Sequence, residues 1–232
     1  MREIIIKIRN KANISDEALY ALSEASHKMW IEKGLDGPWL HVSWEEFRRQ
    51  LQTSTVFVAV DGITGELLGM HCFYANKKQR RAFGFYLAVS PSAQREGIAS
   101  RMLAYEAKRI RLAGFSYLKG ITATNAEWSV RWHLKNGYRI IGYYHSPNDN
   151  FANYVFRKQL VPSILWDNGL YCRLRFLFAY TITHLTKDSR GQDNLIGRIA
   201  RKVLRNRHSS EKPGSFLEET MHVSQRNQAP YS

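Results

Sequence analysis

The stretch Val89–Leu103, which reads VSPSAQREGIASRML, decides how the rest of this chain is interpreted. The apolar run Phe83–Val89 before it has the composition of a buried strand, and the periodic segment Ala99–Leu112 after it has the spacing of a helix. The turn between them carries Pro91 near its start and Gly97 near its end. A strand, a glycine turn and a helix N-terminus aim several backbone N–H groups at one point, where they can bind phosphate. The sequence therefore predicts a site for a phosphorylated ligand in this turn.

The spacing of polar and glycine residues in this turn distinguishes between the known phosphate-binding loops. The chain has neither the G-x-G-x-x-G of dinucleotide-binding folds nor the G-x-x-x-x-G-K-[ST] of P-loops. It has Gln94-x-x-Gly97-x-Ala99 behind a strand that ends at Val89. This arrangement resembles the acetyl-CoA motif R/Q-x-x-G-x-G/A of the GNAT-type N-acetyltransferases. The alternative is an ordinary strand–turn–helix in which Gly97 only permits the tight turn.

A second segment carries the same resemblance. Ile121–Thr124 reads as a β-branched strand, and Glu127–Lys135 reads as a helix that Asn136–Gly137 can end in a left-handed conformation. Asn125 followed by Trp132–Tyr138, WHLKNGY, resembles the second motif of the same family, N…[FL]-Y-x-K-x-G-F. Two such segments, in this order and separated by one helix, lead us to expect the GNAT fold.

The resemblance implies an α/β (α+β) fold in which helices flank a mixed, mostly antiparallel sheet of about seven strands. It covers residues 1–160, which we expect to form one acetyltransferase domain. Hydrophobic periodicity and turn residues predict the elements within it. We expect strands at 1–9, 55–60, 67–74, 83–89, 121–124, 138–144 and 153–160, and helices at 15–30, 43–51, 99–112 and 127–135.

Composition limits the class of protein further. The chain has 232 residues, of which 44% are hydrophobic, so it can bury a substantial core. Its two cysteines, Cys72 and Cys172, lie in apolar surroundings and suit a reducing compartment. The segment Met1–Arg9 has charges where a signal peptide needs an apolar run, and the uncharged stretch Phe176–Thr186 is too short to span a bilayer. We expect a cytoplasmic protein.

The composition changes after Pro162. We expect a basic, aromatic-rich helical extension at 161–208 and a disordered tail at 209–232. Within the extension, Leu195–Arg207 reads as a basic amphipathic helix. This helix could hold the protein at the periphery of an anionic membrane, near a lipid-linked acceptor. The alternative is a helix that packs against the catalytic domain or against the partner in a homodimer.

The net charge of +14 is spread along the chain. Residues 1–160 contain 23 Lys and Arg against 14 Asp and Glu, and residues 161–232 contain 11 against 6. Such a balance favours anionic partners, among them CoA, nucleic acid and an anionic membrane. No helix-turn-helix or RNA-binding signature is visible, which argues against nucleic acid.

The family resemblance assigns the thioester ligand to backbone groups. The N–H of Val89 is the expected oxyanion donor, and Asn125 contacts the pantetheine arm or the loop, caps the following helix, or does both. Arg95 and Arg101 could pair with phosphates or could simply be solvated. The expected acetyl-CoA-binding residues are Leu87, Val89, Gln94, Arg95, Glu96, Gly97, Ile98, Ala99, Ser100 and Asn125.

The proton donor is where the chain departs from the family. Relatives commonly have a tyrosine four residues before the glycine that ends the second-motif helix, and the resemblance gives that tyrosine the role of general acid. Counting back from Gly137 gives His133. An imidazolium there could protonate the departing thiolate, so we predict His133 as catalytic, together with Val89. The alternative is that His133 is only a helix residue and that water assists the thiolate.

The general base is not identified by the sequence. Tyr86, His71, Glu45 and Glu46 are candidates, although each of them is more often a packing or surface residue. On the acceptor side we expect a partly apolar wall built from Trp30, Trp39 and Trp44.

We therefore expect an enzyme that moves an acetyl group from acetyl-CoA to a primary amine of a small molecule or peptide. Neither cysteine lies in a motif, so direct transfer is favoured over an acyl-enzyme, and no metal is expected. The alternative is a CoA-binding or nucleic-acid-binding regulatory module on the same scaffold, without turnover. Turnover of acetyl-CoA with an amine distinguishes the two.

Overall fold

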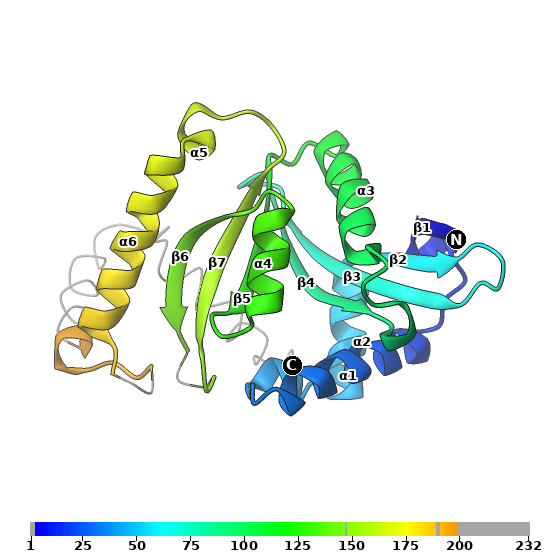
Figure 1. The fold of residues 1–232 in the computed structure, drawn as a ribbon, viewed down its shortest axis with the longest axis horizontal. Coiled ribbons are helices and arrows are strands. Elements are labelled where there is room, and N and C mark those ends of the chain that lie inside the picture. The colour runs from blue at the N-terminus through cyan, green and yellow to red at the C-terminus, as the bar shows by residue number, and fades with distance from the viewer. Residues whose placement is uncertain (1–2, 147, 189–190, 199–232) are drawn as a thin grey trace, which may run out of the picture.

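A computed structural model describes residues 3–146, 148–188 and 191–198 (Figure 1). Its strands form one sheet in the order β1-β2-β3-β4-β5-β7-β6. Only β4 and β5 pair in parallel among these strands, and each of the other neighbouring pairs is antiparallel. The strands are β1 (Ile4–Ile8), β2 (Thr55–Asp61), β3 (Leu67–Asn76), β4 (Arg81–Val89), β5 (Tyr117–Ala123), β6 (Arg139–His145) and β7 (Ala152–Gln159).

Helices cover both faces of this sheet (Figure 1). The first two begin at serine caps, because Ser15 accepts a hydrogen bond from the N–H of Ala18 and Ser43 from the N–H of Glu46. Three short 3₁₀ segments, η1 (Arg9–Lys11), η2 (Pro38–Leu40) and η3 (Pro91–Ala93), form connections. The α-helices are α1 (Asp16–Glu32), α2 (Trp44–Thr53), α3 (Ile98–Leu112), α4 (Glu127–Lys135), α5 (Ile164–Asp167) and α6 (Gly169–Thr186).

Two cores lie on opposite faces of the sheet, because successive side chains of a strand point to opposite sides. Val58 of β2 belongs to the core that contains Leu19 of α1 and Phe47 of α2. The next residue back, Phe57, belongs to the other core, together with Met102 of α3. The sheet is thus buried on both faces along β2.

The predicted fold class is confirmed, since the sheet is mixed, has seven strands in the described residues and is flanked by helices. Several boundaries differ from the prediction by one to three residues, and the start of β5 differs by four. Strand β4 begins at Arg81, two residues before the predicted start at Phe83, after a turn at 77–80. Strand β5 begins at Tyr117 instead of Ile121, because β7 supplies antiparallel partners for its whole length, including Lys119 and Gly120. Strand pairing here outweighs the low strand propensity of these two residues.

The C-terminal helices α5 and α6 lie beside β6, at the edge of the sheet (Figure 1). Thr183 of α6 donates a hydrogen bond to the carbonyl of Tyr143 in β6 at 3.1 Å. The predicted basic helix at 195–207 begins with a helical turn at 195–198, and its remainder lies outside the described residues, as does the predicted tail at 209–232. No helix in the described part of the chain has both the length and the hydropathy needed to cross a bilayer.

Candidate functional site

Strands β4 and β5 pair over a short distance and then separate. Their parallel ladder in the described residues joins Arg81–Phe83 to Tyr117–Lys119. The next residues, Gly84 and Gly120, have no partner in this ladder, although β4 continues to Val89. The two strands therefore diverge toward the end of β4 that carries the predicted phosphate loop.

A β-bulge in β4 contributes to this divergence. Met70 and Cys72 of β3 are two residues apart, but their partners Ala88 and Phe85 are three residues apart. Between these pairs β4 has two residues, Tyr86 and Leu87, where β3 has one, and the φ of Tyr86 is +50°. Bulges bend the strand that contains them, and this one precedes the last three residues of β4.

The backbone of Val89 is directed into the opening. The N–H of Ser90 donates to the carbonyl of Leu68 in β3 at 2.9 Å. Successive residues of an antiparallel strand direct their N–H groups to opposite sides, so Val89, which lies opposite Gly69, directs its own N–H away from β3. This is the donor orientation that the predicted oxyanion role of Val89 requires.

The loop after β4 has the geometry of an anion site. Arg95 and Gly97 both have positive φ, +68° and +77°. The first hydrogen bond of α3 runs from the N–H of Arg101 to the carbonyl of Gly97, so the N–H groups of residues 98–100 precede it. The first turn of α3 contains no acidic residue, and no heavy atom lies within 4 Å of the position that a Cβ on Gly97 would take. The loop therefore fits a pyrophosphate.

The side chains of the predicted loop point in several directions. Ile98 is buried in the core, whereas Gln94, Arg95 and Glu96 are exposed. Ser100 accepts a hydrogen bond from the indole N–H of Trp132 at 3.2 Å, which places α4 beside the first turn of α3. The donors that the described geometry of this loop brings together are therefore the backbone N–H groups at the start of α3.

Two further predictions near the loop have different outcomes. The cap of α4 is Ala126, and no side chain caps this helix, so the interpretation of Asn125 as a helix cap is wrong. Its contact with the pantetheine arm stays a prediction. Arg101 donates to the carbonyl of Ile4 in β1 at 3.4 Å, so this guanidinium has a partner within the protein.

His133 lies on α4, and its side chain packs over β5 and β7. Its Nδ1 is 2.8 Å from the carbonyl oxygen of Ser129, and its ring stacks on Phe156 with 4.5 Å between centroids. Its Nε2 lies 3.2 Å from the position of a Cβ on Gly120. The carbonyl can only accept, so Nδ1 carries the proton and the lone pair of the neutral ring is on Nε2.

Burial disfavours the protonated, imidazolium form of His133. Removal from water lowers the pKa of His133 to about 4, although the hydrogen bond to Ser129 opposes this shift. At neutral pH the ring is therefore uncharged and its Nε2 can accept a proton but has none to give. A direct role as an imidazolium acid, which the sequence predicts, would require the ring to take up a proton first.

The lowered pKa makes an acid-sensitive contribution to stability. The ordinary pKa of a histidine is 6.5 and that of buried His133 is about 4, so the unfolded chain binds a proton in this range that the folded chain does not. Unfolding is therefore favoured as the pH falls from 6.5 toward 4, by about 2–3 kcal/mol for this ring. We expect His133→Phe to show a smaller loss of unfolding free energy than the wild type over this range in urea denaturation. Equal losses in the two proteins would contradict this.

His71, a candidate base, lies in the interior on the α3 side of the sheet. Its Nδ1 is 2.9 Å from Oε2 of Glu106, and both side chains are almost completely buried. The Oε1 of Glu106 has no hydrogen-bond partner in the described residues. Sequence analysis missed Glu106, although an acid at the apolar position between Met102 and Ile110 of a helix is a detectable signal.

Aromatic side chains gather on the opposite face, next to the bulge of β4. The His27 ring of α1 lies 5.7 Å from Tyr86 and 5.9 Å from Trp39, and Trp30 lies 5.3 Å from Trp39 and 5.2 Å from Trp128 of α4. Burial lowers the pKa of His27 to about 4, so this ring is neutral as well. Sequence analysis missed His27, because nothing in its local pattern distinguishes it from other helix residues.

Trp44, the third tryptophan predicted for the acceptor side, is not in the aromatic group. Trp44 packs edge-on against Tyr20 at 5.4 Å, in the core between α1 and α2. The predicted tryptophan wall therefore contains Trp30 and Trp39 but not Trp44. Burial raises the pKa of the Tyr86 hydroxyl, which makes it a weak candidate base at neutral pH.

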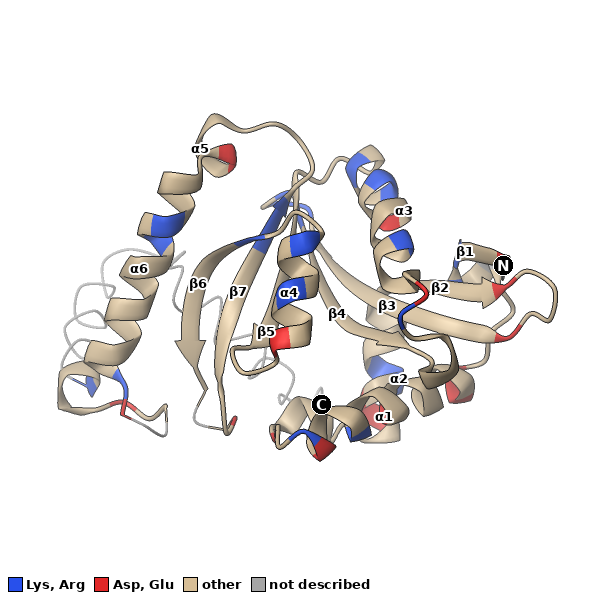
Figure 2. Ribbon diagram, viewed as in Figure 1, with Lys and Arg blue, Asp and Glu red and all other residues tan. Residues whose placement is uncertain are grey.

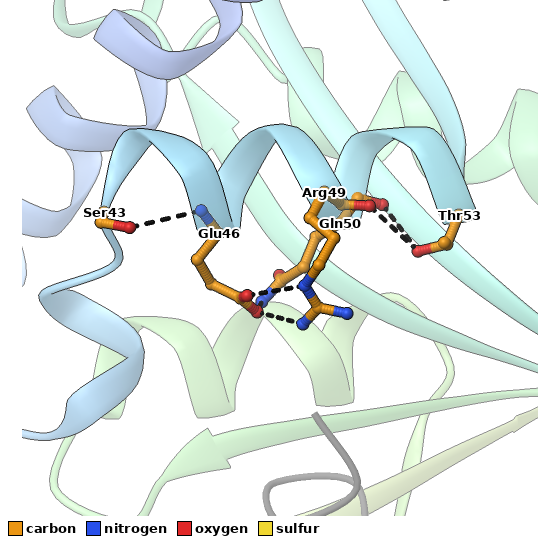
Figure 3. Close-up of polar contacts among 5 residues, drawn as sticks. All are labelled: Ser43, Glu46, Arg49, Gln50 and Thr53. Carbon is orange, nitrogen blue, oxygen red and sulfur yellow. Dashed lines mark hydrogen bonds and ion pairs between the residues drawn. The ribbon is translucent and has the colours of Figure 1, made fainter. Parts of the chain in front are cut away.

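Glu46 is held by its own helix (Figure 3). Two nitrogens of the Arg49 guanidinium donate to its carboxylate at 2.8 and 2.7 Å, and the Gln50 amide donates to it as well. Burial alone would raise the pKa of Glu46, but these hydrogen bonds outweigh it and the pKa is lowered. A carboxylate stabilised in this way is a weak base, and its neighbour Glu45 is exposed.

No group of three or more His, Cys, Asp or Glu side chains in the described residues could hold a metal ion.

Comparisons with known proteins agree with this geometry. A family model described as "Acetyltransferase (GNAT) family" matches residues 18–138, which is 121 of the 232 residues. A search of curated proteins by sequence gives no match.

Solved structures share the fold at low sequence identity. The ribosomal-protein-S18-alanine N-acetyltransferase from Escherichia coli is 12% identical, with a TM-score of 0.53 over 70% of this chain and 96% of that one. An acetyltransferase from Bacillus subtilis in complex with CoA is 15% identical, with a TM-score of 0.53 over 68% and 100%. An aminoglycoside 6′-N-acetyltransferase complexed with coenzyme A is 17% identical, with a TM-score of 0.53 over 68% and 98%. These similarities extend over nearly the whole of each solved chain.

Proposed function

Because the chain belongs to the acetyltransferase (GNAT) family, we propose that it transfers an acetyl group from acetyl-CoA directly to a primary amine. The observation that carries this proposal is the opening between β4 and β5, at which the Val89 N–H and the first turn of α3 converge. Acetyl-CoA supplies the thioester, and two of the similar structures contain CoA. The residues present fit such a ligand, since the loop offers backbone donors, an open position at Gly97 and no acidic side chain in the helix turn.

Backbone groups have the principal binding roles in this proposal. The N–H groups of residues 98–100 face the pyrophosphate, as anions are held at helix N-termini. The backbone of Leu87 and Val89, beyond the bulge of β4, holds the pantetheine arm, and the N–H of Val89 polarises the thioester carbonyl. Gln94 approaches α1, where its amide lies 3.7 Å from the sulfur of Met29, and so borders the acceptor side.

The acceptor approaches along the aromatic face. His27, Trp39 and Tyr86 offer an apolar wall beside the bulge. Next to this wall the side chain of Lys33 lies over the ring of Trp128, with 3.8 Å from its nitrogen to the ring centroid, so an ammonium group is already accommodated beside the aromatic group. We propose a small-molecule or peptide amine as acceptor.

His133 acts at the leaving group in this proposal. The lowered pKa makes the free ring a weak base, so in this proposal Nε2 relays the proton only within the tetrahedral intermediate, taking it from the nitrogen as the C–S bond breaks and passing it to the departing thiolate. The proton that leaves nitrogen is thus the one that arrives on sulfur, and no external acid is needed.

Substitution of His133 tests both its role and the activity. We expect His133→Phe, which keeps the stacking on Phe156, to lower kcat about a hundredfold with little change in the KM for acetyl-CoA. His133→Tyr places a hydroxyl where relatives commonly have one and should recover part of the loss. The measurement is thiol release from acetyl-CoA with amino sugars, polyamines, amino acids and peptides as acceptors. An unchanged kcat in His133→Phe would assign the ring to the scaffold.

The same measurement decides between an enzyme and a regulatory module. Calorimetric binding of acetyl-CoA without turnover of any acceptor would favour the module, since the binding geometry would be intact and the chemistry absent. Turnover with one class of amine supports the enzyme and identifies its substrate class.

A further inference from the structure

Helix α6 has an apolar face that points away from the sheet. Five large apolar side chains on it are at least half exposed, which is unusual for a helix packed on a sheet. Their spacing of four, three, one and seven residues places them on one side of a helix. These residues, the α6 stripe, are Leu170, Leu174, Leu177, Phe178 and Leu185.

The other side of α6 accounts for its packing. Cys172 is buried in a small core with Val155 of β7, and Phe176 packs against Tyr154 at 5.9 Å. At 100° per residue, the α6 stripe lies on the side of the helix opposite Cys172. Its exposure is therefore not a by-product of loose packing, because α6 is fixed to the sheet by its other face.

Positive charge borders this stripe. Arg173 and Arg175 lie at its two margins on the helix, and α6 contains no aspartate or glutamate (Figure 2). The sequence that follows contains five more basic residues between 198 and 207. Apolar side chains flanked by arginines on one helix are typical of a helix that lies in the interface of an anionic membrane.

We propose that α6 docks on an anionic lipid surface, with the α6 stripe among the acyl chains and the flanking arginines at the lipid phosphates. The contact area continues onto α5, where Ile164 and Leu165 are 95% and 59% exposed. The inference does not depend on acetyl transfer, since it rests on a separate part of the molecule.

Charge favours a membrane over a second copy of the chain. Two copies would bring together surfaces of the same sign, each on a protein with a net charge of +14. An anionic lipid surface instead attracts each arginine near it.

Sedimentation with lipid vesicles tests the proposal on the full chain. We expect the protein to bind vesicles of phosphatidylcholine mixed with phosphatidylglycerol, to bind pure phosphatidylcholine weakly, and to dissociate at high salt. The double variant Leu174→Ser/Phe178→Ser should lose affinity for the anionic vesicles by about tenfold or more. The matched control Ile63→Ser/Leu112→Ser also removes two exposed apolar side chains, but outside α5 and α6, and should bind like the wild type.

Three outcomes would overturn the proposal. The wild type could stay in solution with anionic vesicles at low salt. The Leu174→Ser/Phe178→Ser variant could bind as tightly as the wild type, which would assign binding to other basic segments. Light scattering could show a wild-type dimer that this variant converts to a monomer, with no vesicle binding by either, which would assign the stripe to a second copy.

Discussion

Replacing Gly97 with valine is expected to weaken the use of acetyl-CoA tenfold to a hundredfold in kcat/KM, or by about 1.4–2.7 kcal/mol. Gly97 has a φ of +77° and immediately precedes the N–H groups of α3 that we assign to the pyrophosphate. A side chain there meets no protein atom within 4 Å. It would project instead into the space that the ligand needs, and it would strain the backbone that orients the donors.

The control for this variant is Gly65→Val. Gly65 lies in the turn between β2 and β3, has a φ of +73° and likewise has no heavy atom within 4 Å of the position that a Cβ would take. Both variants should therefore lose about 1–2 kcal/mol of stability from the left-handed backbone alone. Steady-state kinetics and urea denaturation of the two proteins separate the effects. A Gly65→Val enzyme as impaired as Gly97→Val would show that backbone strain, and not the ligand site, explains the loss.

Removing the carboxylate of Glu106 is expected to destabilise the fold by about 3–5 kcal/mol, which is enough to unfold many domains of this size. Glu106 is fully buried on α3, and its Oε2 lies 2.9 Å from Nδ1 of the similarly enclosed His71. Glu106→Ala would leave a buried imidazole without this acceptor and a cavity between α3 and the sheet. The free energy of unfolding in urea measures the effect.

Two further variants interpret that result. Glu106→Gln keeps a carbonyl oxygen for His71 and should cost less than Glu106→Ala. Glu127→Ala removes the carboxylate of an exposed pair with Arg131 and should cost less than about 1 kcal/mol. If Glu106→Ala were as mild as Glu127→Ala, the buried pair would not be a stabilising feature of the interior.

Local sequence determined the elements and the loop but not the contacts between distant segments. The glycine turn at Gly97 was predictable because one residue type tolerates its backbone conformation and a helix must follow it. The bulge at Tyr86 was not predictable, because tyrosine disfavours positive φ and the conformation is imposed by the pairing of β4 with β3. The early start of β5 likewise depends on β7, about forty residues away in the chain.

The charge of the His133 ring and the partners of the buried site residues could not be predicted from local sequence either. Counting from Gly137 gave the position of His133 on α4, and its side chain lies against Gly120 of β5. Its neutral charge depends on Phe156 and on burial between layers, which no local pattern shows. The contact between His71 and Glu106 could not be predicted locally either, since the two residues lie 35 positions apart in the chain.

The short β4–β5 ladder has a mechanical consequence. The sheet consists of two stiff plates, β1–β4 and β5–β7, which three residue pairs join at one end. At the other end the plates are free of mutual hydrogen bonds in the ladder, so a thin ligand inserted there touches both plates at once. A ligand bound there as proposed adds contacts between β1–β4 and β5–β7 where the ladder has no hydrogen bonds, so we expect its binding to stabilise the folded protein.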